Sequence, residues 1–416
     1  MALFTTLARM WLTRSWRPFQ FRNEYDQVLP YDECKKMGLY VHIPYCRTLC
    51  DFCPYCKVPY EPERANRYVE NLLQEIRLVC TNHPKREVTS LYFGGGTPAL
   101  LYQRLEEIIQ ELRRYFVITE GIGVELHPSD VTIPVLQELR RAGVTKLSIG
   151  IQSFQKKYQT LLGRSSVDYS AISAALTKVP FETVSFDFIF ALPGQTISDL
   201  ICDVDLAFQL GANHVALYPF IDFSFTKSDV QAMNNPDKRK LLNGITAYLE
   251  KNGCTRTSIW TFSNEKGACY SSMTRENFLG FGCSATTLLN GQFKINTFSP
   301  EAYGNRISHG RLPTSLTLRF SKRQRMVYYL FWTAYSTWVD PKEFQLFFGE
   351  ELSSWYGVEL WLAQRLGWLE NIDGKYHLTL HGAFAYHYLE SFYTLKYIDK
   401  MWNTMRESSF PSKLRL

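Results

Sequence analysis

Residues 39–56 read LYVHIPYCRTLCDFCPYC, a short β-rich run followed at once by a loop with four cysteines. Three residues separate Cys46 from Cys50, and two separate Cys50 from Cys53. Three thiolates on one short loop can bind three irons of a cubane cluster and leave the fourth iron open. An open iron is free to bind a second ligand. The loop therefore predicts a 4Fe-4S cluster bound by Cys46, Cys50 and Cys53.

Two other metal sites fit the same loop. A closed zinc site would use all four thiolates, although zinc sites usually divide their ligands into two separated pairs. An electron-transfer cluster would also use all four, but the loop departs from the ferredoxin spacings. We expect Cys56 to be a neighbouring or unliganded thiol.

From Gly38 onward, short β-rich runs alternate with amphipathic stretches of helical period. The predicted strands are 39–43, 90–93, 123–126, 146–149, 183–188 and 214–217. The predicted helices between them are 64–79, 101–115, 133–142, 169–176 and 198–210. Six such units predict an α/β fold with a parallel, partial (β/α)6 barrel. In such barrels the active site lies at the C-terminal ends of the strands.

A chain of 416 residues exceeds the roughly 250 to 300 residues of a single core, so we expect several regions. The predicted regions are an N-terminal arm (1–37), the barrel core (38–220), a cap on the barrel (221–311) and a C-terminal module (312–416). In the last region, aromatic-rich helices precede a strand pair within 369–378. This order predicts a winged-helix-like module, which amphipathic helices within 382–405 would follow.

The composition is that of a globular protein, with 45% hydrophobic and 21% charged residues. The net charge of +6 is spread without a dense Lys/Arg run, so we expect no nucleic-acid partner. Ten cysteines, four of them close together, favour a metal site in a reducing compartment over a disulfide framework, and we predict a cytoplasmic protein. The aromatic share of 15% favours large flat ligands or an apolar partner surface.

No apolar run reaches the roughly 18 residues of a transmembrane helix. Residues 1–22 carry four arginines among Leu, Phe, Met and Trp, and the first acidic residue is Glu24. This pattern fits a docked arm, a transit peptide or an interfacial helix in peripheral contact with a membrane. We expect the docked arm.

The run LYVHIPYCRTLCDFC resembles the signature of radical S-adenosylmethionine (SAM) enzymes of the oxygen-independent coproporphyrinogen III oxidase type. The resemblance extends from about Leu39 to Thr287 and implies a radical SAM barrel. In that reaction class, SAM chelates the open iron. One electron from the cluster then cleaves SAM to a 5′-deoxyadenosyl radical. A donor such as flavodoxin or ferredoxin would supply the electron.

The resemblance also implies which residues bind SAM. Tyr40 would contact the cofactor and take part in catalysis. The glycines of FGGGTP (93–98) would meet the methionine end of SAM, and Glu125 would pair with its ammonium group. The full set of implied cofactor-binding residues is Tyr40, Phe52, Gly94, Gly95, Gly96, Thr97, Glu125, Gln152, Arg164, Asp187 and Thr286.

Three of these implications carry further consequences. Arg164 and Asp187 keep the pattern of a site for a second SAM molecule. Asp187 lies on the strand face opposite Val184 and Phe186, so it is expected to point into the barrel, where an unpartnered carboxylate is costly. Cys283, in the run FLGFGCSATT (278–287), is a candidate hydrogen-atom donor, with a buried structural thiol as the alternative.

The implied substrate is a porphyrin, heme or another planar small molecule. The family also contains two-SAM methyltransferases, heme-opening enzymes and heme chaperones, which are the alternatives. In a chaperone, heme would be bound without turnover, and His42, His127 and His214 are candidate contacts. The oxidase carries its fourth cysteine two residues after the third, whereas Cys56 follows Cys53 by three.

Overall fold

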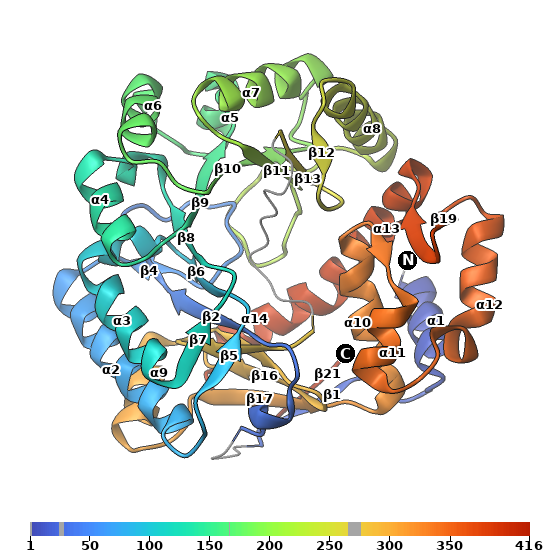
Figure 1. Cartoon of the computed structure of the whole chain (residues 1–416), viewed down its shortest axis with the longest axis horizontal. Coiled ribbons are helices and arrows are strands. Elements are labelled where there is room, and N and C mark those ends of the chain that lie inside the picture. Colours follow the sequence, from blue (N-terminus) through green and yellow to red (C-terminus); the bar gives the residue numbers. More distant parts are fainter. Residues whose placement is uncertain (1, 25–28, 166, 265–275) are drawn as a thin grey trace.

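The computed structural model describes residues 2–24, 29–165, 167–264 and 276–416 (Figure 1). Within these residues, 14 strands form one continuous sheet. Their order is β12-β13-β11-β10-β9-β8-β6-β2-β14-β15-β16-β17-β1-β21. Figure 1 shows the sheet curving around the centre of the molecule, with helices outside it.

Parallel strands form the middle of this sheet. They are β2 (Gly38–Ile43), β6 (Leu91–Gly95), β8 (Ile122–Leu126), β9 (Lys146–Gln152), β10 (Thr183–Phe190), β11 (His214–Pro219) and β14 (Phe278–Phe281). The first six confirm the predicted strands and the α/β partial barrel. β14 was not predicted; it lies far along the chain yet pairs in parallel with β2.

Helices cover the outer face of the parallel strands. They are α2 (Pro62–Cys80), α3 (Tyr102–Tyr115), α4 (Ile133–Arg141), α5 (Lys156–Leu161), α6 (Tyr169–Lys178), α7 (Ile197–Gln209), α8 (Asn235–Lys251) and α9 (Pro300–Ser308). Each predicted helix is present. The amphipathic pattern explains why: α3, for example, buries Leu105, Ile108, Ile109 and Leu112 on one face.

Antiparallel strands extend the sheet at both ends. They are β12 (Thr255–Arg256), β13 (Thr261–Ser263), β15 (Thr286–Leu288), β16 (Gln292–Asn296), β17 (Thr314–Arg319), β1 (Gln20–Arg22) and β21 (Lys413–Arg415). The segment 221–311 was expected to cap the barrel, but its described strands belong to the sheet itself. β1 pairs with both β17 and β21, so the two ends of the chain meet.

Short elements complete the barrel. They are the 3-10 turns η1 (Tyr31–Glu33), η2 (Pro98–Leu101) and η3 (Pro128–Asp130), and the strand pairs β3 (Tyr45–Cys46) with β4 (Val58–Pro59) and β5 (Arg86–Val88) with β7 (Phe116–Ile118). η2 and η3 directly follow the strand ends at which the candidate site lies.

The C-terminal region has the element order of a winged helix: helix, strand, two helices and a hairpin. These elements are α10 (Lys322–Tyr335), β18 (Trp338–Val339), α11 (Pro341–Phe348), α12 (Leu352–Arg365), β19 (Leu369–Ile372) and β20 (Lys375–Leu378). Met326, Tyr329 and Phe344 lie in its own small core, which explains much of the aromatic content.

Three further helical elements pack against this module and the barrel. α13 (Leu380–Tyr393) continues through a π-helical turn (η4, Thr394–Ile398) into α14 (Asp399–Glu407). α1 (Ala2–Thr13), in the predicted N-terminal arm, is helical and lies against α10 and α13. None of the helices in the described part of the chain is both long and apolar enough to cross a membrane.

Candidate functional site

The cysteine loop leaves the C-terminal end of β2. Its base is closed by the pairing of β3 with β4, where the Tyr60 N–H donates to the Cys46 carbonyl at 2.9 Å. At the far end of the loop, the Cys53 N–H donates to the Cys50 carbonyl at 3.3 Å. Cys46, Cys50 and Cys53 are free and partly exposed. One short, closed loop therefore presents three thiols beside the strand ends.

Polar side chains from two other loops, one after β6 and one after α5, reach two of these thiols. The Thr97 hydroxyl lies 3.7 Å from the Cys46 sulfur, and the Arg164 guanidinium lies 4.0 Å from the Cys50 sulfur. Burial raises the pKa of Cys46 to about 11, against the hydrogen bond from Thr97. Burial also raises the pKa of Cys50, against the charge of Arg164. A metal that replaces the thiol protons would bind thiolates beside which the Thr97 hydroxyl and the Arg164 guanidinium already lie.

The glycine turn after β6 packs against Glu125. The Gly95 N–H and the Tyr92 hydroxyl each donate to the Glu125 carboxylate at 3.0 Å, and burial raises the pKa of Glu125. A Cβ at Gly94 would lie 2.9 Å from a Glu125 oxygen, and one at Gly95, whose φ is +119°, would lie 2.5 Å from the His42 ring. Glycine is needed here because protein groups approach so closely.

The backbone N–H groups of this turn already have protein acceptors. The Gly96 N–H donates to the Ile43 carbonyl and the Thr97 N–H to the Tyr45 carbonyl, both at 2.8 Å. A ligand that contacts the turn would therefore meet carbonyl oxygens and the Glu125 carboxylate. These groups accept hydrogen bonds from an ammonium group.

The ends of β9 and β10 carry the remaining predicted polar residues. Arg164 donates to the Gly150 carbonyl at 2.5 Å, and Gln152 has a φ of +70°, which is rare outside glycine. Asp187 accepts from the hydroxyls of Ser148 and Ser185, the latter at 3.0 Å. Burial raises the pKa of Asp187 to about 7.

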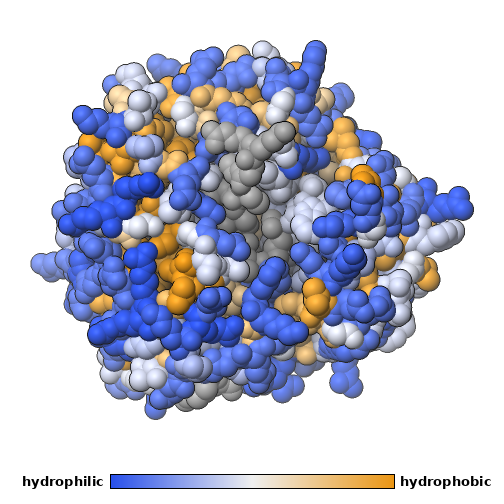
Figure 2. All heavy atoms as spheres, viewed as in Figure 1, coloured by the Kyte–Doolittle hydropathy of each residue, from blue (hydrophilic) through white to orange (hydrophobic). Residues whose placement is uncertain are grey.

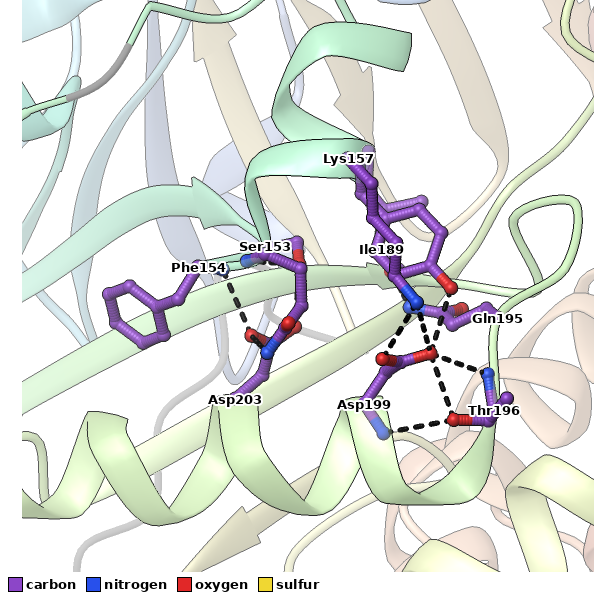
Figure 3. A network of polar contacts seen from close by, with 10 residues as sticks. Ser153, Phe154, Lys157, Ile189, Gln195, Thr196, Asp199 and Asp203 are labelled. Carbon is purple, nitrogen blue, oxygen red and sulfur yellow. Dashed lines mark hydrogen bonds and ion pairs between the residues drawn. The ribbon is translucent and has the colours of Figure 1, made fainter.

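A polar network holds the segment between Gln152 and Arg164 against α7 (Figure 3). Asp203 of α7 accepts from the Ser153 hydroxyl at 2.7 Å and from the Phe154 N–H at 2.9 Å. Burial raises the pKa of Asp203 to about 6. The network fixes the start of this segment and so helps to place Arg164 near Cys50.

One turn closer to the start of α7, a second carboxylate anchors the same segment (Figure 3). Asp199 forms a capping box with Thr196 and pairs with Lys157 of α5 at 2.9 Å. Burial alone would raise the pKa of Asp199, but the hydrogen bonds from Lys157 and Thr196 lower it to about 2. Gln195 donates to the Ile189 carbonyl at 3.3 Å and fixes the turn after β10.

Cys56 points away from the other loop cysteines. Its thiol donates to the Phe298 carbonyl at 3.1 Å, and its sulfur, the Cys283 sulfur and a His42 nitrogen all lie within 4.8 Å of one another. In the described part of the chain, Cys46, Cys50 and Cys53 do not form such a single-ion set. Cys56 is therefore buried among residues outside the loop, whereas the other three thiols are partly exposed.

Cys283 is fully buried, and burial raises its pKa well above the usual thiol value. Its N–H donates to the Tyr68 hydroxyl at 2.9 Å, and its thiol hydrogen-bonds to Cys56. These contacts are with protein groups at the back of the cysteine loop. The role of Cys283 as a hydrogen-atom donor stays a prediction.

Tyr40 lies between the cysteine loop and the glycine turn. Its hydroxyl is 3.0 Å from Nδ1 of His42, and its ring stacks on Tyr92. Phe52 packs against a small apolar cluster that contains Tyr158 and Leu162. Thr286 is the first residue of β15. Its backbone carbonyl lies so close to Gly280 that a side chain at Gly280 would clash with it.

The three candidate heme histidines all have protein partners. His42 lies between the Tyr40 hydroxyl and the Cys56 carbonyl, each at 3.0 Å. His127 caps η3, and His214 is buried beside Ser185. Burial lowers the pKa of both His127 and His214 to about 4, so these two rings are neutral near neutral pH.

A pocket of about 330 Å³ lies between the cysteine loop and α14. Aromatic and cationic side chains contribute to its lining, together with loop cysteines. Among the lining residues are Cys53, Tyr55, Lys57, Phe225, Lys227 and Arg406. Asp51 and Glu301 also line it, and Arg406 lies 4.2 Å over the Phe225 ring.

Sequence reasoning missed Tyr92, Ser148 and Ser185, which hydrogen-bond to the two interior carboxylates. Strand alternation could have found the serines. Ser185 lies two residues before Asp187 on the same face of β10, and Ser148 pairs with Ser185 across the β9–β10 ladder.

Residues 40–207 match the family described as the Radical SAM superfamily. The chain is also similar to curated proteins named heme chaperone HemW and oxygen-independent coproporphyrinogen III oxidase. The heme chaperone HemW of Bacillus subtilis is 24% identical over 360 residues, which is 82% of this chain and 95% of that protein. The oxygen-independent coproporphyrinogen III oxidase of Cereibacter sphaeroides is 27% identical over 311 residues, 68% of this chain and 69% of that protein.

A solved structure shares the fold of this chain. Coproporphyrinogen III oxidase (HemN) from Escherichia coli, described as a radical SAM enzyme, superimposes with a TM-score of 0.74 at 20% identity. The match covers 93% of this chain and 98% of that chain. The correspondence therefore includes the helical C-terminal region as well as the barrel.

Figure 2 shows the face of the molecule seen in Figure 1. Polar side chains dominate its rim, and apolar side chains show through on the left half, over the parallel strands and their helices.

Proposed function

We propose that this protein is a radical SAM enzyme that acts on a porphyrin, heme or related planar substrate. The observation that carries the proposal is that the loop at the end of β2 holds three free, partly exposed thiols, Cys46, Cys50 and Cys53, whereas Cys56 is buried. Three thiolates hold a cluster and leave one iron for the cofactor. A cluster bound here would supply one electron for the reductive cleavage of SAM.

The residues around the loop fit the cofactor. Glu125 and the carbonyl oxygens of the glycine turn would bind the SAM ammonium group. The Arg164 guanidinium lies 4.0 Å from the Cys50 sulfur, so it would bind a carboxylate group placed beside Cys50. Asp187, with its two serine donors, would accept from a hydroxyl or bind a second SAM molecule deeper among the strand ends.

Two observations support a planar acidic substrate. The relatives bear the names heme chaperone and coproporphyrinogen III oxidase. The pocket beside the cysteine loop combines the Tyr55 and Phe225 rings with Lys57, Lys227 and Arg406. Aromatic faces stack on flat ligands, and these cations pair with carboxylate substituents.

The test is anaerobic cluster reconstitution followed by incubation with SAM, a reductant and either coproporphyrinogen III or heme. We expect 5′-deoxyadenosine in the presence of reductant, and a modified tetrapyrrole in mass spectra of one of the two mixtures. Cys50→Ala is the matched control and is expected to give neither product. A methylated product would identify a two-SAM methyltransferase, and an opened macrocycle would identify a heme-opening enzyme.

A heme chaperone is the second candidate, favoured by the match to HemW over 95% of that protein. It predicts stoichiometric heme uptake and transfer without substrate turnover. Heme titration of the reconstituted protein, followed in parallel with 5′-deoxyadenosine, separates the two functions. Uptake that persists in Cys50→Ala, with no cleavage of SAM in the wild-type protein, would overturn the enzymatic proposal.

A further inference from the structure

Helices α1 and α12 lie on the side of the molecule opposite α3 and α4 (Figure 1). Both expose large apolar side chains. On α1, Leu7 and Trp11 lie one turn apart and are 52% and 55% exposed. On α12, Val358, Trp361 and Leu362 have the i, i+3, i+4 spacing of one helix face and are 62%, 58% and 48% exposed. We call these five side chains the tryptophan face.

An ion pair and two hydrogen bonds hold α1 and α12 together. The Arg14 guanidinium pairs with Glu359 of α12 at 2.7 Å. Arg323 of α10 donates to the Leu12 carbonyl of α1 and to the Trp355 carbonyl of α12, both at 2.9 Å. These contacts fix the position of α1 relative to α12.

The surroundings of this face are basic. The Arg14 guanidinium lies 4.1 Å over the Trp11 ring, and the Arg365 guanidinium lies 5.8 Å over the Trp361 ring. Arg17 is exposed nearby in sequence, and residues 1–22 contain no acidic residue. Glu359, the acid between the two helices, is paired with Arg14. The face therefore combines exposed tryptophans with cations that the ring contacts hold beside them.

We propose that the tryptophan face docks on an anionic phospholipid bilayer. Tryptophan favours the boundary between headgroups and acyl chains, where its ring is apolar and its N–H stays hydrated. Arginine beside it bonds lipid phosphates while its stem lies along apolar surface. α1 has 12 residues, so it would lie in the interface and not span it. This inference does not depend on the proposed function.

The test uses the full-length protein and unilamellar vesicles in a sedimentation assay. One set contains equal parts of phosphatidylcholine and phosphatidylglycerol, and the other contains phosphatidylcholine alone. We expect binding to the anionic vesicles that weakens as salt is raised. Trp11→Ser combined with Trp361→Ser should weaken binding by at least about tenfold, and Arg365→Gln by about fivefold.

Val117→Ser is the matched control, because Val117 is an apolar side chain 45% exposed on β7 of the barrel. It should bind vesicles as the wild type does. Circular dichroism melting checks that each variant folds, and Trp361→Ser alone replaces the double variant if the latter does not.

Three results would overturn the proposal: no binding to anionic vesicles, equal binding by the tryptophan variants, or binding that salt does not change. A wild-type dimer that the double variant converts to a monomer, without vesicle binding, would assign the face to a second copy of the chain instead.

Discussion

Cys46, Cys50 and Cys53 differ sharply in their surroundings from Cys56 and Cys283, although four of the five lie on one loop. The first three are partly exposed, and polar groups from other loops lie beside two of them. Cys56 and Cys283 are 8% and 0% exposed and hydrogen-bond to each other. The thiols of the first group are open to solvent, whereas the two sulfurs of the second lie in a buried set with a His42 nitrogen that is compact enough for a single metal ion.

The return of the chain into β4 accounts for the difference. Cys56 lies just before this strand, whose start is held by a hydrogen bond from the Val58 N–H to the Pro44 carbonyl at 2.7 Å. The strand pairing therefore draws Cys56 beneath the loop, toward Phe298 and Cys283. Solvent access and hydrogen-bond partners thus agree with the spacing in distinguishing Cys56 from the other three cysteines of the loop.

The largest expected effect is on the cluster itself. Cys50→Ala should lose nearly all bound iron after anaerobic reconstitution, because two thiolates cannot replace three. Cys56→Ala should retain it. Iron and acid-labile sulfide analysis, with the visible absorbance of the cluster, measures both variants. Equal losses in the two variants would make Cys56 a fourth ligand and end the distinction between the groups.

The second prediction concerns Gly95, which packs against His42, a neighbour of the buried Cys56. Gly95→Ala should lower the free energy of unfolding by about 3 kcal/mol, since its φ is +119° and the new Cβ would meet the His42 ring. His42 in turn contacts the Cys56 carbonyl. Gly291→Ala, where nothing lies within 4 Å of the added Cβ, is the control and should change stability by under about 0.5 kcal/mol. Denaturant unfolding compares them; similar losses would contradict the tight packing at Gly95.

A smaller effect is expected for the carboxylate that faces the glycine turn. Glu125→Gln should weaken SAM binding to the reconstituted protein by about tenfold, because the charged partner of the ammonium group is lost. Its cluster content should equal that of the wild type. Glu138→Gln, which removes a surface partner of Arg141, is the matched control. Unchanged affinity in equilibrium binding would remove Glu125 from the cofactor site.

The smallest effect concerns Asp187 and is pH-dependent. Its pKa rises from 3.8 to about 7 on burial, so the folded state favours the protonated carboxyl. The stability that this group contributes is complete in acid and is lost as pH rises from about 4 through about 7. Asp187→Asn should therefore melt about 2–4 °C above the wild type near pH 8, with no difference near pH 4. A constant difference across pH would show that Asp187 is not buried as described.

Local pattern was sufficient for the parallel half of the fold. Strands form where predicted at 39–43 and 183–188, and a helix forms at 101–115. Burial of one or both faces of an element gives its sequence a hydrophobic periodicity, which is why these elements could be predicted. The three-plus-one division of the cysteine loop was also expected from spacing and family resemblance. The predicted domain boundaries and the roles of individual site residues stay predictions.

Pairing between distant segments could not be read from local pattern. β14 lies beside β2, and β1 lies between β17 and β21, because the tertiary fold brings these distant segments together. The same holds for the partners of Asp187 and Glu125, which come from neighbouring strands of the ladder.

By itself the sequence determined the strand–helix alternation and the three thiols of the candidate cluster, since periodicity and spacing are local properties of the chain. Only the tertiary structure decided that the free thiols of Cys56 and Cys283 lie next to each other and that strands of the segment 221–311 extend the sheet. Those outcomes depend on which surfaces meet in space, and burial and hydrogen bonding between residues far apart in the chain decide that.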